Sequence, residues 1–113
     1  MQIDTADKVA RIRKLNDRFR QSFMGGKVMR TATVAALPVE LQTKIMTAVQ
    51  QFADFNEDND PHKEHDFMSV EIDGEKYFAK IDYYALDMEH GSEDPSAPAK
   101  TTRVLTIMHA SDY

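Results

Sequence analysis

The chain has 113 residues, of which 42% are apolar and 29% are charged, and its net charge is −5. This length suits a single domain, residues 1–113, with one hydrophobic core. Because the chain contains no cysteine, disulfides, thiolate metal sites and cysteine nucleophiles are excluded.

The sequence carries no membrane or secretion signal. No apolar run approaches the ~18 residues of a membrane-spanning helix, and the N-terminus lacks the apolar centre of a signal peptide. A chain without cysteine also suits a reducing compartment. We therefore expect a cytoplasmic protein with no membrane partner.

The charge is divided along the chain. Residues 1–30 hold eight basic and three acidic residues, whereas residues 31–113 hold six basic and sixteen acidic residues. Such a division allows two surfaces to attract different partners, or the basic end of one copy to meet the acidic end of another. The alternative is that the two parts neutralise each other within one fold.

The first predicted element is a helix over residues 4–23. Its apolar residues recur every three or four positions, Asp4 or Thr5 can cap its start, and Gly25-Gly26 can end it. Residues 27–36 are rich in β-branched side chains and predict a strand. The apolar stripe of the helix consists of Val9, Ile12, Leu15, Phe19 and Phe23.

A second amphipathic helix is predicted over residues 39–55, with Pro38 at its start. Two alternating segments, 67–73 and 76–84, then flank Asp73-Gly74-Glu75 and predict a β-hairpin. In residues 101–110, apolar side chains occupy both odd and even positions, so both faces of the segment are apolar, which is typical of a central strand. The Ser, Pro and Ala-rich part of residues 91–100 is a candidate disordered segment.

Together these elements predict an α+β domain in the order α-β-α-β-β-β. We expect a mainly antiparallel sheet of about four strands, with two helices packed on one face.

The stretch 56-NEDNDPHKEHDF-67 combines the side chains that bind metal ions and transfer protons. Zinc, manganese or iron could be held by His62, His65 and Asp66 if the loop bent around an ion. Alternatively, His65 and Asp66 could form an acid/base pair that Asp82, Tyr83 or Tyr84 reaches across the hairpin. Either arrangement would make the protein a metal-dependent hydrolase or nuclease-like enzyme.

A structural role explains the same residues. Asp, Asn and Pro form turns, and their side chains bond to nearby backbone. In this interpretation residues 57–64 are an exposed acidic surface, and His65-Asp66-Phe67 leads into the sheet. We then expect no metal and no cofactor.

The basic first helix suggests a third possibility, a DNA-associated regulator. Its cations could contact phosphates, although they spread around the polar side and no helix-turn-helix follows. A solvated face is the simpler interpretation. The residues concerned are Arg11, Arg13, Lys14, Arg18 and Arg20.

Four blocks, 12-IRKLNDRFR-20, 54-DFNEDNDPHKEHDF-67, 80-KIDYY-84 and 102-TRVLTIMHASDY-113, resemble a family of small bacterial proteins catalogued as a domain of unknown function. The resemblance runs nearly end to end, and members of the family look like cargo of plasmids and other mobile elements. It implies no reaction and no ligand. The signature positions that it implies are Asn16-Asp17, Asp60-Pro61, His65-Asp66-Phe67, Lys80-Ile81-Asp82-Tyr83-Tyr84 and Arg103-Val104-Leu105-Thr106.

The resemblance and the acidic charge together favour a binding protein over an enzyme. Small acidic proteins of mobile elements are similar in kind to anti-CRISPR and anti-restriction inhibitors, which bind a nuclease complex. We therefore favour a monomer or homodimer that contacts a protein partner, such as a host nuclease or CRISPR complex, through an acidic surface. The expected contact residues are Glu57, Asp58, Asp60, Glu64, Asp66, Asp82, Tyr83 and Tyr84.

Overall fold

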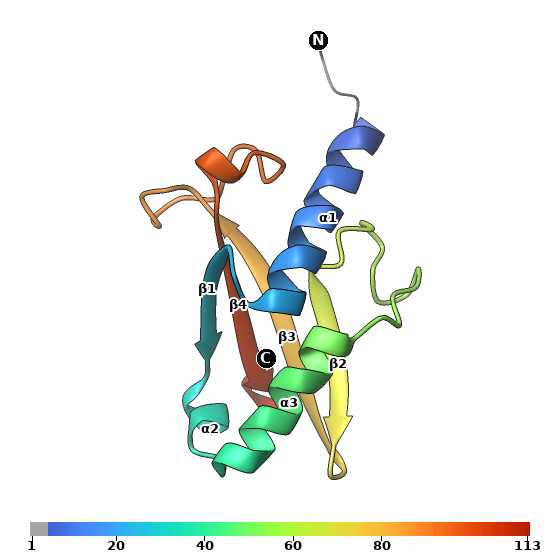
Figure 1. Ribbon diagram of the computed structural model, residues 1–113, viewed down its shortest axis with the longest axis vertical. Helices are drawn as coiled ribbons and strands as arrows, with labels where there is room; N and C mark the ends of the chain where they lie inside the picture. The colour runs from blue at the N-terminus through green and yellow to red at the C-terminus, as the bar shows by residue number, and fades with distance from the viewer. Residues whose placement is uncertain (1–4) are drawn as a thin grey trace.

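The computed structural model describes residues 5–113 and confirms the α+β class, with helices on one face of a four-stranded sheet (Figure 1). Asp4, a possible cap of the first helix, lies outside the described residues. The helices and strands, in chain order, are α1 (Thr5–Ser22), β1 (Gly26–Arg30), α2 (Ala32–Ala35), α3 (Val39–Gln51), β2 (Phe67–Ile72), β3 (Glu75–Tyr84), the 3-10 helix η1 (Pro98–Lys100), β4 (Thr102–His109) and the 3-10 helix η2 (Ala110–Asp112).

The sheet has the order β1-β4-β3-β2, so the last strand is central, as predicted. β2, β3 and β4 pair antiparallel, whereas β1 runs parallel to β4, which makes the sheet mixed. The predicted hairpin is confirmed, because Asp73 (φ 52°) and Gly74 (φ 81°) both adopt the left-handed backbone of a type I′ turn.

The core lies between the sheet and the helices. Phe19 of α1 and Ile45 and Val49 of α3 are almost fully buried against strand residues such as Leu105 and Ile107. Each such side chain contributes about 1.5–3 kcal/mol through burial of apolar surface. The amphipathic patterns in the sequence therefore identify the faces that build this core.

Two predicted boundaries are wrong. The strand expected over residues 27–36 stops at Arg30, because Thr31 is the N-cap of α2 and its hydroxyl accepts a hydrogen bond from the backbone N–H of Val34. The helix expected to reach residue 55 ends at Gln51, and Phe52 is its C-cap.

The turn from α1 into β1 depends on a close approach between two backbones. Phe23 leaves the helix with φ 59°. A Cβ atom on Gly26 would lie 2.5 Å from the carbonyl oxygen of Arg103 and 2.7 Å from the ring of Phe19. Only glycine therefore allows β1 to lie beside β4 at this point.

The segment 91–100, a candidate for disorder, is ordered in the structure. The carboxylate of Asp94 accepts hydrogen bonds from the backbone and the hydroxyl of Ser96, whose side chain is buried. The hydroxyl groups of Ser92 and Thr101 form a hydrogen bond with 2.7 Å between their oxygens. Among residues 5–113, no helix has the length and apolar character needed to cross a membrane.

Candidate functional site

The acidic loop, residues 52–66 between α3 and β2, is held together by its own asparagines. Asn56 Oδ1 accepts hydrogen bonds from the backbone N–H groups of Asp58 (2.9 Å) and Asn59 (3.1 Å). Asn59 in turn accepts from the backbone N–H of Asn56 at 2.8 Å and donates to the Asp54 carbonyl at 2.7 Å. The exposed side chains of Glu57 and Asp58, called the acidic tip below, therefore stand on a fixed loop.

Asp60 does not belong to the exposed acidic surface expected for residues 57–64, because only 7% of it is accessible. Its Oδ1 accepts a hydrogen bond from the backbone N–H of His65 at 3.1 Å. Its Oδ2 lies 3.6 Å from Nε2 of the His65 ring. Asp60 therefore supports the histidine from inside the loop.

His65 is fixed from several sides. Its Nδ1 lies 2.8 Å from Oδ1 of Asp17 on α1, and its ring stacks on Phe55 with 3.8 Å between centroids. The guanidinium of Arg20 lies over Phe55 and also donates to Asp17 at 3.0 Å. The backbone of His65 is left-handed, with φ 55°, a conformation that costs a non-glycine residue about 1–2 kcal/mol. Both ring nitrogens therefore face carboxylates, and the surrounding contacts maintain a strained backbone.

A second network, behind the loop, connects α1 to the sheet through Asn16, which is completely buried. Asn16 Oδ1 accepts from Nε of the buried Arg103 at 2.7 Å. Its Nδ2 donates to the Glu64 carbonyl (2.9 Å) and to the Tyr83 hydroxyl (2.7 Å). Tyr83 completes the network by donating to Oε1 of Glu64 at 2.6 Å.

Burial changes the titration of three groups near this network. It raises the pKa of Asp66, and the negative charge of Glu64 raises it further. Burial, followed by the hydrogen bond to Glu64, also raises the pKa of the Tyr83 hydroxyl. Burial lowers the pKa of Arg103, whose guanidinium bonds to neutral oxygens of Asn16 and Pro95 and lies over the Tyr83 ring.

The structure does not bring His65, Asp66 and Asp82 together. His65 bonds to Asp17, whereas Asp82 forms an ion pair with Lys80 at 3.2 Å. The backbone carbonyl of Asp66 accepts a hydrogen bond from the N–H of Ile81 at 2.8 Å, which ties this residue to the sheet.

The remaining predicted residues also differ in exposure. His62 is exposed, and Tyr84 is half-buried opposite Thr102 in the sheet. The hairpin turn lies at the far end of β2 from the acidic loop (Figure 1). Only the C-terminal half of β3 therefore adjoins the loop.

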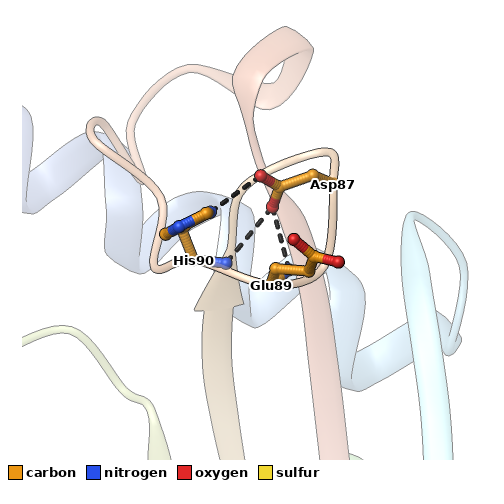
Figure 2. A group of neighbouring side chains, drawn as sticks. All are labelled: Asp87, Glu89 and His90. Atoms are coloured by element: carbon orange, nitrogen blue, oxygen red, sulfur yellow. Dashed lines mark hydrogen bonds and ion pairs between the residues drawn. The ribbon is translucent and has the colours of Figure 1, made fainter.

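Another group of side chains, Asp87, Glu89 and His90, is close enough to hold a metal ion (Figure 2). Within residues 5–113, the set of His62, His65 and Asp66 does not form such a group. The Asp87 carboxylate accepts from the backbone N–H groups of Glu89 (2.8 Å) and His90 (3.2 Å) and lies 2.8 Å from His90 Nδ1. These bonds lower the pKa of Asp87, and the bond from the Glu89 N–H contributes most. The three side chains therefore lie together because Asp87 closes the turn that contains Glu89 and His90.

Two hollows are lined by the stacked rings of Phe55 and His65. One has a volume of about 260 Å³ and is lined by both rings together with Arg13, Glu57 and other loop residues. The other, of about 360 Å³, lies between α1 and the end of α3 and is lined by both rings and Arg20. Arg13 donates to the Lys63 carbonyl at 3.0 Å, which holds the loop against the helix.

Sequence reasoning gave no role in this site to Asn16, Asp17, Phe55, Arg20 or Arg103. Asn16 and Asp17 contact residues 48 to 87 positions further along the chain, and local patterns carry no information on such pairs. The available signal was the resemblance, which marks Asn16-Asp17 and Arg103 as signature positions.

Residues 30–112 match the model of a family described as "Protein of unknown function (DUF3768)". The match starts at Arg30, so α1 and the first of the four resembling blocks lie outside it. No curated protein matches the chain, and no solved structure matches it either.

Proposed function

The chain belongs to the DUF3768 family, whose description assigns no activity, and we propose from its geometry that it is a small acidic binding protein. It docks onto a basic surface of a protein partner through the acidic tip, Glu57 and Asp58. The observation that carries this proposal is the asparagine-tied loop that holds both carboxylates toward solvent.

The construction of the loop supports binding. Loops longer than about 12–15 residues without secondary structure are usually functional or disordered, and the hydrogen bonds of this loop argue for function. A loop that is already ordered loses little conformational entropy when a partner binds. Carboxylates at its tip also accelerate association with a basic surface.

The contacts of His65 favour binding over catalysis. A general base needs a nitrogen within hydrogen-bond reach of the substrate. Nδ1 of His65 lies 2.8 Å from Oδ1 of Asp17, and Nε2 lies 3.6 Å from Oδ2 of Asp60, so each nitrogen already faces a carboxylate of the fold. The ring serves as a cross-link between α1 and the loop.

The partner that we propose is a host nuclease complex, which makes the protein an anti-CRISPR or anti-restriction inhibitor. The resemblance to cargo of mobile elements motivates this choice. Nucleases hold nucleic acid in basic grooves, and a rigid acidic loop has the charge to compete for such a groove. Inhibition then requires contact alone.

The test uses a panel of purified CRISPR effector complexes and restriction nucleases, with binding and DNA cleavage as readouts. The variant Glu57→Gln/Asp58→Asn removes two charges without disturbing the loop, because no hydrogen bond to either carboxylate exists among residues 5–113. Asp60 and Glu64 are left intact, since their bonds are structural. We expect at least about a tenfold loss of affinity at low salt.

The matched control is Glu71→Gln/Glu89→Gln, which removes two exposed charges outside the acidic loop and should bind like the wild type. The proposal fails if no complex is bound or inhibited. An acidic-tip variant as active as the control would also remove the loop from the mechanism.

A further inference from the structure

Three cations on the outer side of α1 have no partner within residues 5–113. The side chains of Arg11, Lys14 and Arg18, called the cationic stripe below, are exposed, and no hydrogen bond or ion pair reaches them there. Arg13 and Arg20 of the same helix instead turn inward and bond to the rest of the fold. The fold therefore neutralises only part of the basic charge of α1.

The spacing of the stripe makes its members repel one another. Lys14 follows Arg11 by three positions and precedes Arg18 by four, and residues at these spacings are neighbours on a helix surface. Like charges placed in this way destabilise a helix by a few tenths of a kcal/mol per pair. An external anion that contacts the stripe would relieve this repulsion.

Two residues of the cationic stripe line a groove that shares Arg13 with the hollow at Glu57. A groove of about 670 Å³ runs along α1 and is lined by Arg13, Lys14 and Arg18. Arg13 also lines the hollow of about 260 Å³ that reaches Glu57. Arg13 therefore lines both hollows, one of which holds Lys14 and Arg18 and the other Glu57, and the acidic loop runs alongside α1 (Figure 1).

We propose that the cationic stripe, the acidic tip and the two hollows that share Arg13 form an interface with a second copy of the chain. When two copies are related by a two-fold axis, each residue contact occurs twice, with the roles exchanged. The stripe of each copy then meets Glu57 and Asp58 of the other. A nucleic acid on the stripe would be repelled by the acidic tip, whereas a second copy complements both sides.

The interface also regulates access to the acidic tip, and this part of the inference rests on the proposed function. Two copies joined in this way cover the tip that the partner needs. Self-association and partner binding therefore compete. A variant that cannot self-associate but keeps the tip should bind the partner more tightly than the wild type at high protein concentration.

The test is sedimentation velocity of the protein alone at low and high salt, with charge-reversed variants. One variant is Arg11→Glu/Lys14→Glu/Arg18→Glu, and the other is Glu57→Lys/Asp58→Lys. We expect the wild type to dimerise at about 0.02–0.05 M salt and to dissociate at about 0.5 M, where charges are screened beyond a few ångströms.

Each reversed variant alone should be monomeric, because like charges then meet across the axis. An equimolar mixture of the two variants should restore the dimer. The reversed, now acidic stripe of the first variant meets the reversed, now basic tip of the second, and the unchanged stripe of the second variant meets the unchanged tip of the first. The control Lys44→Glu/Lys76→Glu/Lys100→Glu reverses three exposed lysines elsewhere and should leave the dimer intact.

Several results would overturn the inference. These are a wild type that is monomeric at low salt, a reversed variant that still dimerises, and a mixture of folded variants that stays monomeric. Binding of an oligonucleotide that the stripe reversal abolishes, without any dimer, would assign the stripe to nucleic acid instead. None of these measurements contains the nuclease partner, so they fail or succeed independently of the proposed function.

Discussion

Replacing Asn16 with alanine should be among the most damaging single changes in α1. The side chain is completely buried and makes three hydrogen bonds, one of them to a guanidinium. A bond between neutral groups contributes about 1 kcal/mol and one to a charged group about 2 kcal/mol. We therefore expect Asn16→Ala to lower the free energy of unfolding by about 4 kcal/mol, against a total of about 5–15 kcal/mol for a typical domain.

Urea unfolding followed by circular dichroism measures this loss. The matched control is Gln21→Ala, since Gln21 is an exposed amide on the same helix whose side chain makes no hydrogen bond among the described residues, and it should cost less than about 0.5 kcal/mol. Asn16→Asp keeps an acceptor for Arg103 and should lie between the two. Equal stability of Asn16→Ala and Gln21→Ala would refute the claim that this network attaches α1 to the sheet.

Three further substitutions test other parts of the fold. Gly26→Ala places a Cβ atom 2.5 Å from the Arg103 carbonyl oxygen and should cost about 1–3 kcal/mol; a melting temperature equal to that of the wild type would contradict the close approach. Lys63→Gly removes a side chain from a left-handed residue (φ 60°) and should stabilise the protein by up to about 1 kcal/mol in urea unfolding; a loss of stability would show that the lysine side chain contributes. Burial raises the pKa of Asp66. The protonated Asp66 side chain therefore stabilises the folded state below the ordinary pKa of an aspartate, and this stabilisation is lost as the pH rises through the raised pKa. At neutral pH, Asp66→Asn should therefore raise the free energy of unfolding by a fraction of a kcal/mol relative to the wild type. At about pH 3 it should have no effect, because Asp66 of the wild type is then protonated in both the folded and the unfolded state. A lower free energy of unfolding for Asp66→Asn at neutral pH would contradict the burial argument.

The parts of the fold that the sequence predicts correctly are those that local chemistry determines. The Asp73-Gly74 turn fixes its hairpin, because both residues tolerate the left-handed backbone that the turn requires. The apolar residues that recur along α1 predict its buried face, and Ile12 and Phe19 are buried there. Long-range pairing has no such local signal, and the parallel register of β1 on β4 was not predicted.

The candidate site shows the same division. The composition of residues 56–66 marks them as a candidate site and predicts an exposed acidic surface, and Glu57 and Asp58 are exposed. The composition predicts neither the burial of Asp60 nor the pairing of His65 with Asp17, which lies 48 positions earlier in the chain. Candidate catalytic groups chosen by proximity in the sequence therefore missed the actual partner of His65.

The position of β4 between β1 and β3 has a consequence for how the chain reaches its native state. β1 has no strand partner until Thr102–His109 is available, whereas β2, β3 and β4 pair with their neighbours in sequence order. Contacts between segments that are distant in the sequence form slowly, because closing a long loop costs entropy before any contact repays it. During synthesis, Gly26–Arg30 therefore has no strand partner until β4 has been made, and an unpaired strand is prone to aggregation.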